Sequence, residues 1–180
     1  MLFWGRLSKL NSAFKVVRFI DGLSLWSGKI FAWLSVPLVG GLVYEVVARY
    51  AFNSPTEWAY DITYMLYGII FMMGAAYTLY NKGHIRTDLL YNTFPARWQG
   101  LIDTIFYLFF FFPGMILFLV AGWDYAAHAW DIKETAAYSP WRPIVYPFKT
   151  VIPIAIILLI IQGIAEFIKS VYATTRGEWR

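Results

Sequence analysis

The chain has 180 residues, of which 59% are hydrophobic, 21% aromatic and 14% charged, and its formal net charge is +4. A soluble domain of this length cannot hide so much apolar surface from water, so we expect lipid to cover part of it. The sequence has no cysteine, which excludes disulfides, thiolate metal sites and cysteine nucleophiles. Because the basic residues flank apolar runs, membrane orientation explains the positive charge better than nucleic-acid binding does.

The first segment, residues 1–20, is predicted to be an amphipathic helix that lies in the membrane surface. Apolar side chains recur there at helical spacing, and Lys9, Ser12 and Lys15 fall on the opposite side. This pattern is typical of an interfacial helix with its apolar face down. A frayed basic tail is the alternative. No apolar stretch precedes Arg18, so we do not expect a cleaved signal peptide.

Four long apolar stretches follow, and a spanning helix needs about 20 mostly apolar residues. The predicted spans are residues 23–50, 57–80, 98–124 and 150–173. The middle two have charge-free cores, whereas the outer two carry charges that must reach the interface at their ends. A soluble bundle would need polar helix faces, which these stretches lack. The predicted fold class is therefore an all-α integral membrane protein with one membrane domain, residues 1–180.

Orientation follows from the distribution of lysine and arginine. If the N-terminus is cytoplasmic, residues 81–97 form a cytoplasmic loop and residues 125–149 a periplasmic loop. The inside segments then carry ten basic residues and the outside segments four, with Lys29 unassigned. The positive-inside rule therefore predicts that both termini are cytoplasmic.

The outer end of the first span and the loop after it contain several candidate contact residues. Glu45 and Arg49 have the i, i+4 spacing and order that favour an ion pair on a helix. The pair either neutralises itself or contacts a partner helix or subunit. Beyond a predicted turn at residues 53–55, Thr56 is a candidate N-cap for the second helix. Trp58 suits the interface, and Asp61 should lie about one turn into that helix.

The stretch NKGHIRTDLL, residues 81–90, is the most polar in the middle of the chain. Its glycine, Gly83, is a candidate helix C-cap. Arg86 and Asp88 are candidate anchors or subunit contacts at the headgroup level. His84 is interpreted as a polar interface residue.

The second outer loop, residues 125–149, is rich in aromatic residues and proline. It is predicted either to dock an outside partner or to lie along the membrane surface as an interfacial belt. The candidate docking residues are Asp131, Lys133, Glu134, Trp141 and Arg142.

No motif predicts catalysis, so we expect no catalytic residue, metal or cofactor, and no enzyme activity. His84 and His128 fall on opposite sides of the predicted bilayer core, about 30 Å apart, so they cannot share a haem or build a zinc site. A haem-bearing four-helix cytochrome subunit remains an alternative, and a small stand-alone channel or carrier is another. Uncharged middle spans argue against transport by this chain alone.

Motifs in a fixed order resemble a known family. The run Arg49-Tyr50, Phe52-Asn53, Pro55 and Trp58 is followed by Gly83-His84-Ile85-Arg86 and Asp88-Leu89-Leu90. From about Glu45 onward the chain resembles the small, DctQ-type membrane subunit of tripartite ATP-independent periplasmic (TRAP) transporters. The run SPWRPIVYPFK, followed by an apolar stretch ending in IQGIAEFIK, is similar to members with an extended outer loop. Where such proteins often carry two adjacent acids after the tryptophan, this chain has Tyr60-Asp61.

The resemblance implies partners and a location that composition does not show. A small subunit of this kind sits as a multi-pass protein in a bacterial inner membrane, in contact with lipid. It pairs with a large DctM-type subunit that moves as an elevator and holds the substrate and sodium sites. A periplasmic DctP-type binding protein delivers the substrate, typically an organic acid. The small subunit would then be a scaffold that also helps to dock the binding protein.

Overall fold

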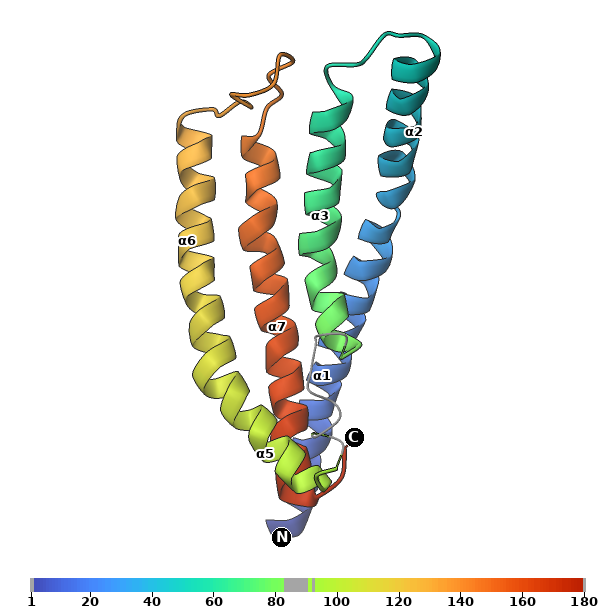
Figure 1. Cartoon of the computed structure of the whole chain (residues 1–180). Helices are drawn as coiled ribbons and strands as arrows, with labels where there is room; N and C mark the ends of the chain where they lie inside the picture. The colour runs from blue at the N-terminus through green and yellow to red at the C-terminus, as the bar shows by residue number, and fades with distance from the viewer. Residues whose placement is uncertain (1, 83–90, 92, 180) are drawn as a thin grey trace. The chain divides into compact units, whose positions relative to one another are not determined.

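The computed structural model describes residues 2–82, 91 and 93–179, with side chains from Phe14 onward. In these residues the regular structure is helical, and an isolated antiparallel bridge pairs Thr135 with Ile144. Four helical stretches are long and apolar enough to cross a membrane: Phe14–Ala51, Ala59–Tyr80, Ala96–Asp131 and Tyr146–Arg176. The chain is therefore an all-α membrane protein, as its sequence predicts (Figure 1).

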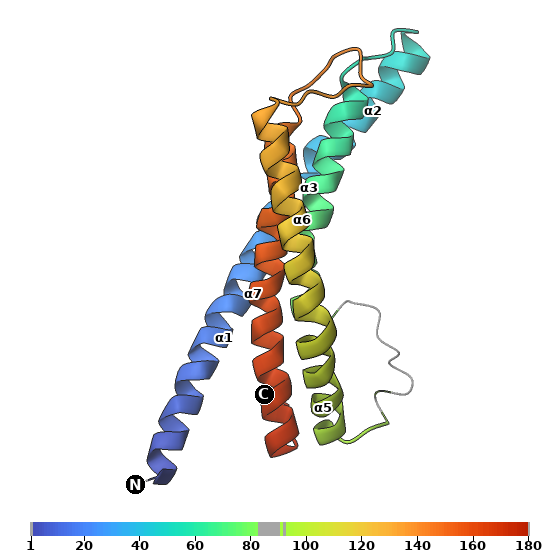
Figure 2. The same cartoon turned by 90° about the vertical axis from the view of Figure 1, so that its left-hand side faces the viewer.

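The first stretch contains two helices, α1 (Leu2–Ala32) and α2 (Ser35–Ala51). Pro37 explains the break, because a proline cannot bond to the carbonyl four residues earlier and its ring clashes with it. That carbonyl belongs to Trp33, which accepts a hydrogen bond from the Val36 amide at 3.1 Å instead. The sequence predicts a boundary between residues 20 and 23, but α1 continues without a break through that region (Figure 2).

Helix α3 (Ala59–Tyr80) follows a loop of residues 52–58. Asn53 takes a left-handed conformation with φ of 49° in the predicted turn. The prediction that Thr56 caps α3 is wrong, because α3 begins three residues later and Thr56 bonds to Glu45 on α2. At the other end, Lys82 adopts φ of 54° and terminates the helix. The proposed cap Gly83 lies outside the described residues.

The third stretch is a single run of helix with a change of winding. Helix α5 (Ala96–Phe106) leads into a π-helical turn, η1 (Tyr107–Phe111), and then into α6 (Phe112–Asp131). The Phe112 amide bonds to the Tyr107 carbonyl, the i to i+5 bond of a π turn. Pro113 has no amide hydrogen to donate to the carbonyl of Phe109. The π turn therefore lies where the regular α-helical hydrogen bonding is already interrupted.

The last stretch is helix α7 (Tyr146–Arg176). Pro147 occupies its first turn, where the missing amide costs nothing. Pro153 lies inside the helix and leaves the carbonyl of Lys149 without its usual amide partner. Helix α7 is the most buried of the four stretches. By contrast, the 18-residue apolar segment that makes Phe14–Ala51 a candidate span contains no buried residue.

The described chain forms two compact units. Unit 1 comprises Met1–Trp26, Ala76–Leu117 and Leu158–Arg180, and unit 2 comprises Ser27–Ala75 and Phe118–Ile157.

The core of unit 1 joins α1 to the second half of α7. Val17 and Ile20 are buried against Ala165, with Phe14, Ile161 and Ile168 packed around them. Close approach of α5 to α7 depends on Gly100, since a Cβ there would lie 2.6 Å from the Thr174 amide nitrogen. Backbones can approach this closely in membrane helices only where side chains are small.

The core of unit 2 joins α3 and α6 to the first half of α7. A Cβ on Gly68 of α3 would lie 2.7 Å from the Phe148 ring, and a Cβ on Gly122 of α6 would lie 3.1 Å from Ile152. These two glycines therefore bring α3 and α6 close to one face of α7. The 132–145 loop connects the ends of α6 and α7 (Figure 1).

Candidate functional site

The most deeply buried polar group of unit 1 is the Gln162 cluster, formed by Asp21, Ser24, Gln162, Glu166 and Lys169. Gln162 is fully buried, and Ser24 and Glu166 are each 2% exposed. The Ser24 hydroxyl donates to Gln162 Oε1 at 2.7 Å, and Gln162 Nε2 donates to Asp21 Oδ1 at 2.9 Å. Lys169 Nζ donates to Asp21 Oδ1 at 3.0 Å and to Glu166 Oε1 at 2.7 Å.

The Gln162 cluster stabilises one register of α1 on α7. Its charges are two carboxylates and one ammonium, and the amide of Gln162 donates to both acids. A buried polar network of this kind is favourable only while every member keeps its partners. Every buried side-chain polar atom in the described residues has a hydrogen-bond partner, so the cluster is suited to holding helices together.

A second cluster, the Glu45 cluster, joins the end of α2 to the loop that follows it. Arg49 Nε and Nη2 donate to Glu45 Oε1 at 2.9 and 2.5 Å, which confirms the predicted ion pair. The other carboxylate oxygen accepts from the Thr56 amide at 3.0 Å and from the Thr56 hydroxyl. Glu45 thus holds the 52–58 loop against its own helix. Trp58 stacks on Tyr44 beside it, with ring centroids 5.6 Å apart.

The 132–145 loop is fixed at both its base and its middle. At the base, Lys149 Nζ donates to Glu134 Oε2 at 2.5 Å and lies 3.9 Å from the centroid of the Tyr125 ring. In the middle, the Ser139 hydroxyl donates to Asp61 at the start of α3. The loop therefore has a defined shape, although Tyr138 and Trp141 in it remain exposed to the surroundings.

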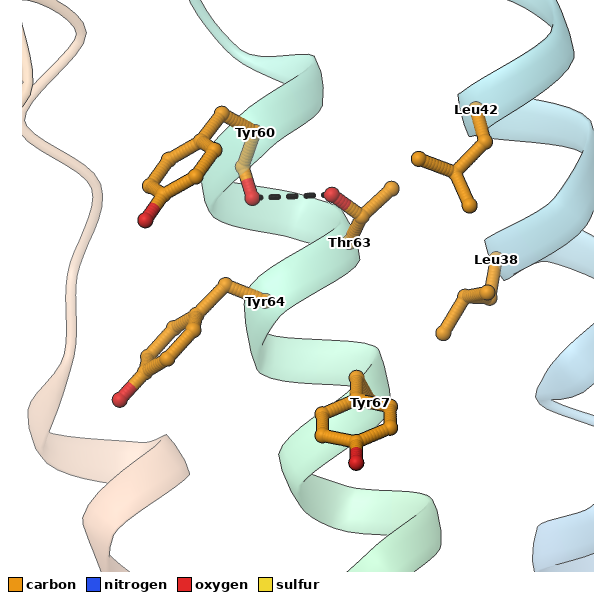
Figure 3. A pocket seen from close by; sticks show the side chains of 6 residues that line it. All are labelled: Leu38, Leu42, Tyr60, Thr63, Tyr64 and Tyr67. Atoms are coloured by element: carbon orange, nitrogen blue, oxygen red, sulfur yellow. Dashed lines mark hydrogen bonds between the residues drawn. The ribbon is translucent and has the colours of Figure 1, made fainter.

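A small cleft lies between α2 and α3. It measures about 260 Å³ and is lined by Leu38 and Leu42 on one side and by Thr63 and three tyrosines on the other. In Figure 3 the two leucines point from α2 toward α3, and the Thr63 hydroxyl donates to the Tyr60 carbonyl. The cleft has no charged lining residue. We therefore interpret it as a gap in the packing of α2 against α3 that apolar groups cover.

The structure describes most of the predicted contact residues, and they lie at two different loops. Glu45, Arg49 and Trp58 gather around the 52–58 loop, whereas Asp61 and Glu134 secure the 132–145 loop. The remaining candidates are exposed: Lys133, Trp141 and Arg142 in that loop, and Asp131 at the end of α6. Lys133 and Arg142 both have φ of 48° and so mark its turns. Arg86, Asp88 and His84 lie outside the described residues.

Sequence reasoning missed the Gln162 cluster, although part of its signal is visible. Gln162, Glu166 and Lys169 fall on one face of a helix because they are four and three residues apart. Asp21 and Ser24 share a face of α1 for the same reason. Nothing in the local pattern indicates that these two faces meet. Among the described residues, no group of three or more histidine, cysteine, aspartate or glutamate side chains is arranged to hold a metal ion.

Comparison with known proteins gives a family for most of the chain. Residues 38–172 match the family described as tripartite ATP-independent periplasmic transporters, DctQ component. The chain is 31% identical over 84 residues to the C4-dicarboxylate TRAP transporter small permease protein DctQ of Vibrio cholerae, covering 45% of this chain and 34% of that protein. It is 24% identical over 95 residues to the sialic acid TRAP transporter permease protein SiaT of Haemophilus influenzae, covering 53% of this chain and 15% of that protein. The match to the family extends over most of the chain, which therefore belongs to the DctQ component family of tripartite ATP-independent periplasmic transporters.

Proposed function

We propose that this chain is the non-catalytic scaffold subunit of a sodium-driven TRAP transporter that takes up an organic acid. Membership of the DctQ component family over residues 38–172 carries this proposal. The names of two relatives support the substrate class, because one refers to C4-dicarboxylates and the other to sialic acid. Both compounds are organic acids.

The internal chemistry of the described spans supports a scaffold role. Their most buried polar side chains, such as Gln162, Glu166 and Lys149, bond to other residues of the same chain. Groups that are fully used in holding helices together are not available to bind and release a substrate. Transport sites in membranes usually need such polar groups at mid-membrane. We therefore assign the substrate and sodium sites to a large, DctM-type membrane subunit.

The surface of the first span supports a partner in the membrane. No residue of its 18-residue apolar segment is buried within the chain. Exposed apolar helices of this length must face lipid or other helices. We infer an inner-membrane complex with cytoplasmic termini in which α1 and α2 present this surface.

The 132–145 loop is our proposed docking point for the periplasmic DctP-type binding protein. Its fixation by Asp61 and Lys149 presents the exposed side chains of Trp141, Lys133 and Arg142 in one conformation. A pre-ordered loop loses little conformational entropy on binding. We propose that these exposed residues contact the binding protein and that Glu134 only supports the loop.

Copurification tests the proposed function most simply. A tagged copy of the chain, expressed in its own host and purified in mild detergent, should bring down a large multi-span membrane protein encoded by a neighbouring gene. A preparation containing the chain alone at every detergent tested would contradict a scaffold role. A Soret absorbance band in that preparation would instead support the haem alternative.

A further inference from the structure

Unit 2 contains a large groove beside the 132–145 loop. It measures about 1370 Å³, and all of its lining residues belong to α3, α6, α7 and the two loops of unit 2. Small-molecule sites occupy about 300–1,000 Å³, so this groove is large for a metabolite.

The walls and floor of the groove come from different helices. Gly68 and Gly122 bring α3 and α6 close to α7, so the half-buried Phe148 and Ile152 of α7 lie at the base. The walls consist of exposed side chains such as Phe71 of α3 and Phe118 of α6. The result is a concave apolar surface between two parallel ridges, the shape that receives a helix.

The kinds of side chain in the walls favour a protein occupant over acyl chains. Tyrosine, phenylalanine and methionine line the groove, including Tyr60, Tyr64, Met65 and Met72. Aromatic residues and methionine are enriched at protein interfaces, where their shape gives directional contacts. Disordered lipid tails require no such composition, because any apolar surface suffices for them.

The end of the groove next to the 132–145 loop is polar and acidic. Glu57, Asp61 and Glu134 line it together with a single cation, Lys149. Asp61 and Glu134 accept hydrogen bonds from Ser139 and Lys149. Glu57 is exposed, and its side chain makes no hydrogen bond or ion pair in the described structure. The formal charge at this end is negative, so a positively charged group of an occupant would be attracted here.

We propose that this groove is the docking site for one transmembrane helix of the large subunit, with a lysine or arginine near the end of that helix facing Glu57. The inference rests on the proposed function, since it requires a large subunit. A basic residue at the end of an apolar span is tolerated, because its long side chain reaches the interface there. The proposal adds a contact face on α3, α6 and α7 to the surface that α1 and α2 present.

Site-specific cross-linking tests the face directly, because the chain has no native cysteine. Ala121 is exposed and lines the groove, whereas Ala127 is exposed on the same helix outside it. Ala121→Cys and Ala127→Cys would each be labelled with a thiol-reactive benzophenone and irradiated in the purified complex. We expect a cross-link to the large subunit from position 121 and at least about tenfold less from position 127, in line with the short reach of the probe.

The possible outcomes separate the two proposals. If no large subunit copurifies with the unmodified chain, the proposed function fails, and this inference fails with it. If the large subunit copurifies but position 121 cross-links only to phospholipid, or positions 121 and 127 cross-link equally, the groove assignment is wrong while the proposed function stands.

A charge reversal tests the acidic end independently. Glu57→Lys should lower recovery of the large subunit about tenfold, the effect expected when a favourable charge contact becomes a repulsive one. Asp124→Lys is the matched control, because Asp124 is also exposed on unit 2 but does not line the groove. Equal recovery with both variants would overturn the role given to Glu57.

Discussion

At the residue scale, Lys169 is the side chain on which the Gln162 cluster depends most. It bonds to both Asp21 and Glu166, and the side chains of these acids are only 19% and 3% exposed. Removing the ammonium would leave two carboxylates facing each other in a largely dry environment. The cluster is therefore more sensitive to loss of one member than to replacement of several together.

Lys169→Met should destabilise the purified chain by about 3–5 kcal/mol, the range for removing one partner of a buried ion pair. The measurement is thermal unfolding in detergent, followed by circular dichroism. Lys15→Met is the control, because Lys15 is exposed. Adding Asp21→Asn to Lys169→Met should restore part of the loss, and a double variant as unstable as the single one would contradict the charge argument.

A second prediction at this scale concerns Glu45. Glu45→Gln should make the 52–58 loop more open to proteolysis, because its acid joins Arg49 to the loop residue Thr56. Limited digestion in detergent, read by mass spectrometry, measures the cleavage rate in the loop. Glu57→Gln is the control in the same loop, and equal rates for both variants would show that Glu45 does not hold the loop.

At the scale of elements, prolines explain where the helices depart from regular winding. Pro37 lies four residues after Trp33, where the chain breaks between α1 and α2. Pro113 follows the π turn η1, whereas α7 remains α-helical through Pro153. Each departure lies at or next to the carbonyl that the proline leaves without an amide.

Pro37→Ala should restore regular helix across residues 33–36. The alanine would supply the missing amide to the Trp33 carbonyl, and it would remove the clash with the ring. Slower amide hydrogen exchange at residues 33–36 than in the unmodified chain is the expected result. Unchanged exchange there would mean that packing, and not Pro37, imposes the break.

The 132–145 loop gives a prediction for docking. Trp141→Ala should weaken binding of the periplasmic binding protein to the assembled complex, because a large exposed aromatic side chain in an ordered loop is a typical hot spot. We expect at least about a tenfold higher dissociation constant. Trp123→Ala, which removes an exposed tryptophan of α6, is the control. Equal affinities would assign the loop to the membrane surface instead.

At the scale of the whole molecule, the sequence predicts local features better than distant ones. The four spans follow from apolar runs, and the Glu45–Arg49 pair follows from spacing within one helix. The bond between Asp21 and Gln162 joins residues 141 positions apart, so no local pattern reveals it. The sequence predicts Thr56 as a cap of α3 because capping tendency is local, but the Glu45 carboxylate, eleven positions earlier, provides a competing acceptor.

The groove illustrates the same limit for the proposed binding face. Glu57 and Glu134 lie in separate loops, and only the folding of α3, α6 and α7 brings them to one end of the groove. The sequence shows acids in both outer loops and glycines in the spans. It does not show that Gly68 and Gly122 both approach α7, which is what produces the concavity.

Sodium-driven uptake into proteoliposomes tests the central claim most directly. Vesicles would contain the large subunit with or without this chain, and the binding protein would be supplied outside together with its organic acid. If the chain is a scaffold subunit, uptake should require it, and vesicles with this chain alone should show no flux. Undiminished uptake in its absence, or flux through the chain alone, would contradict the account.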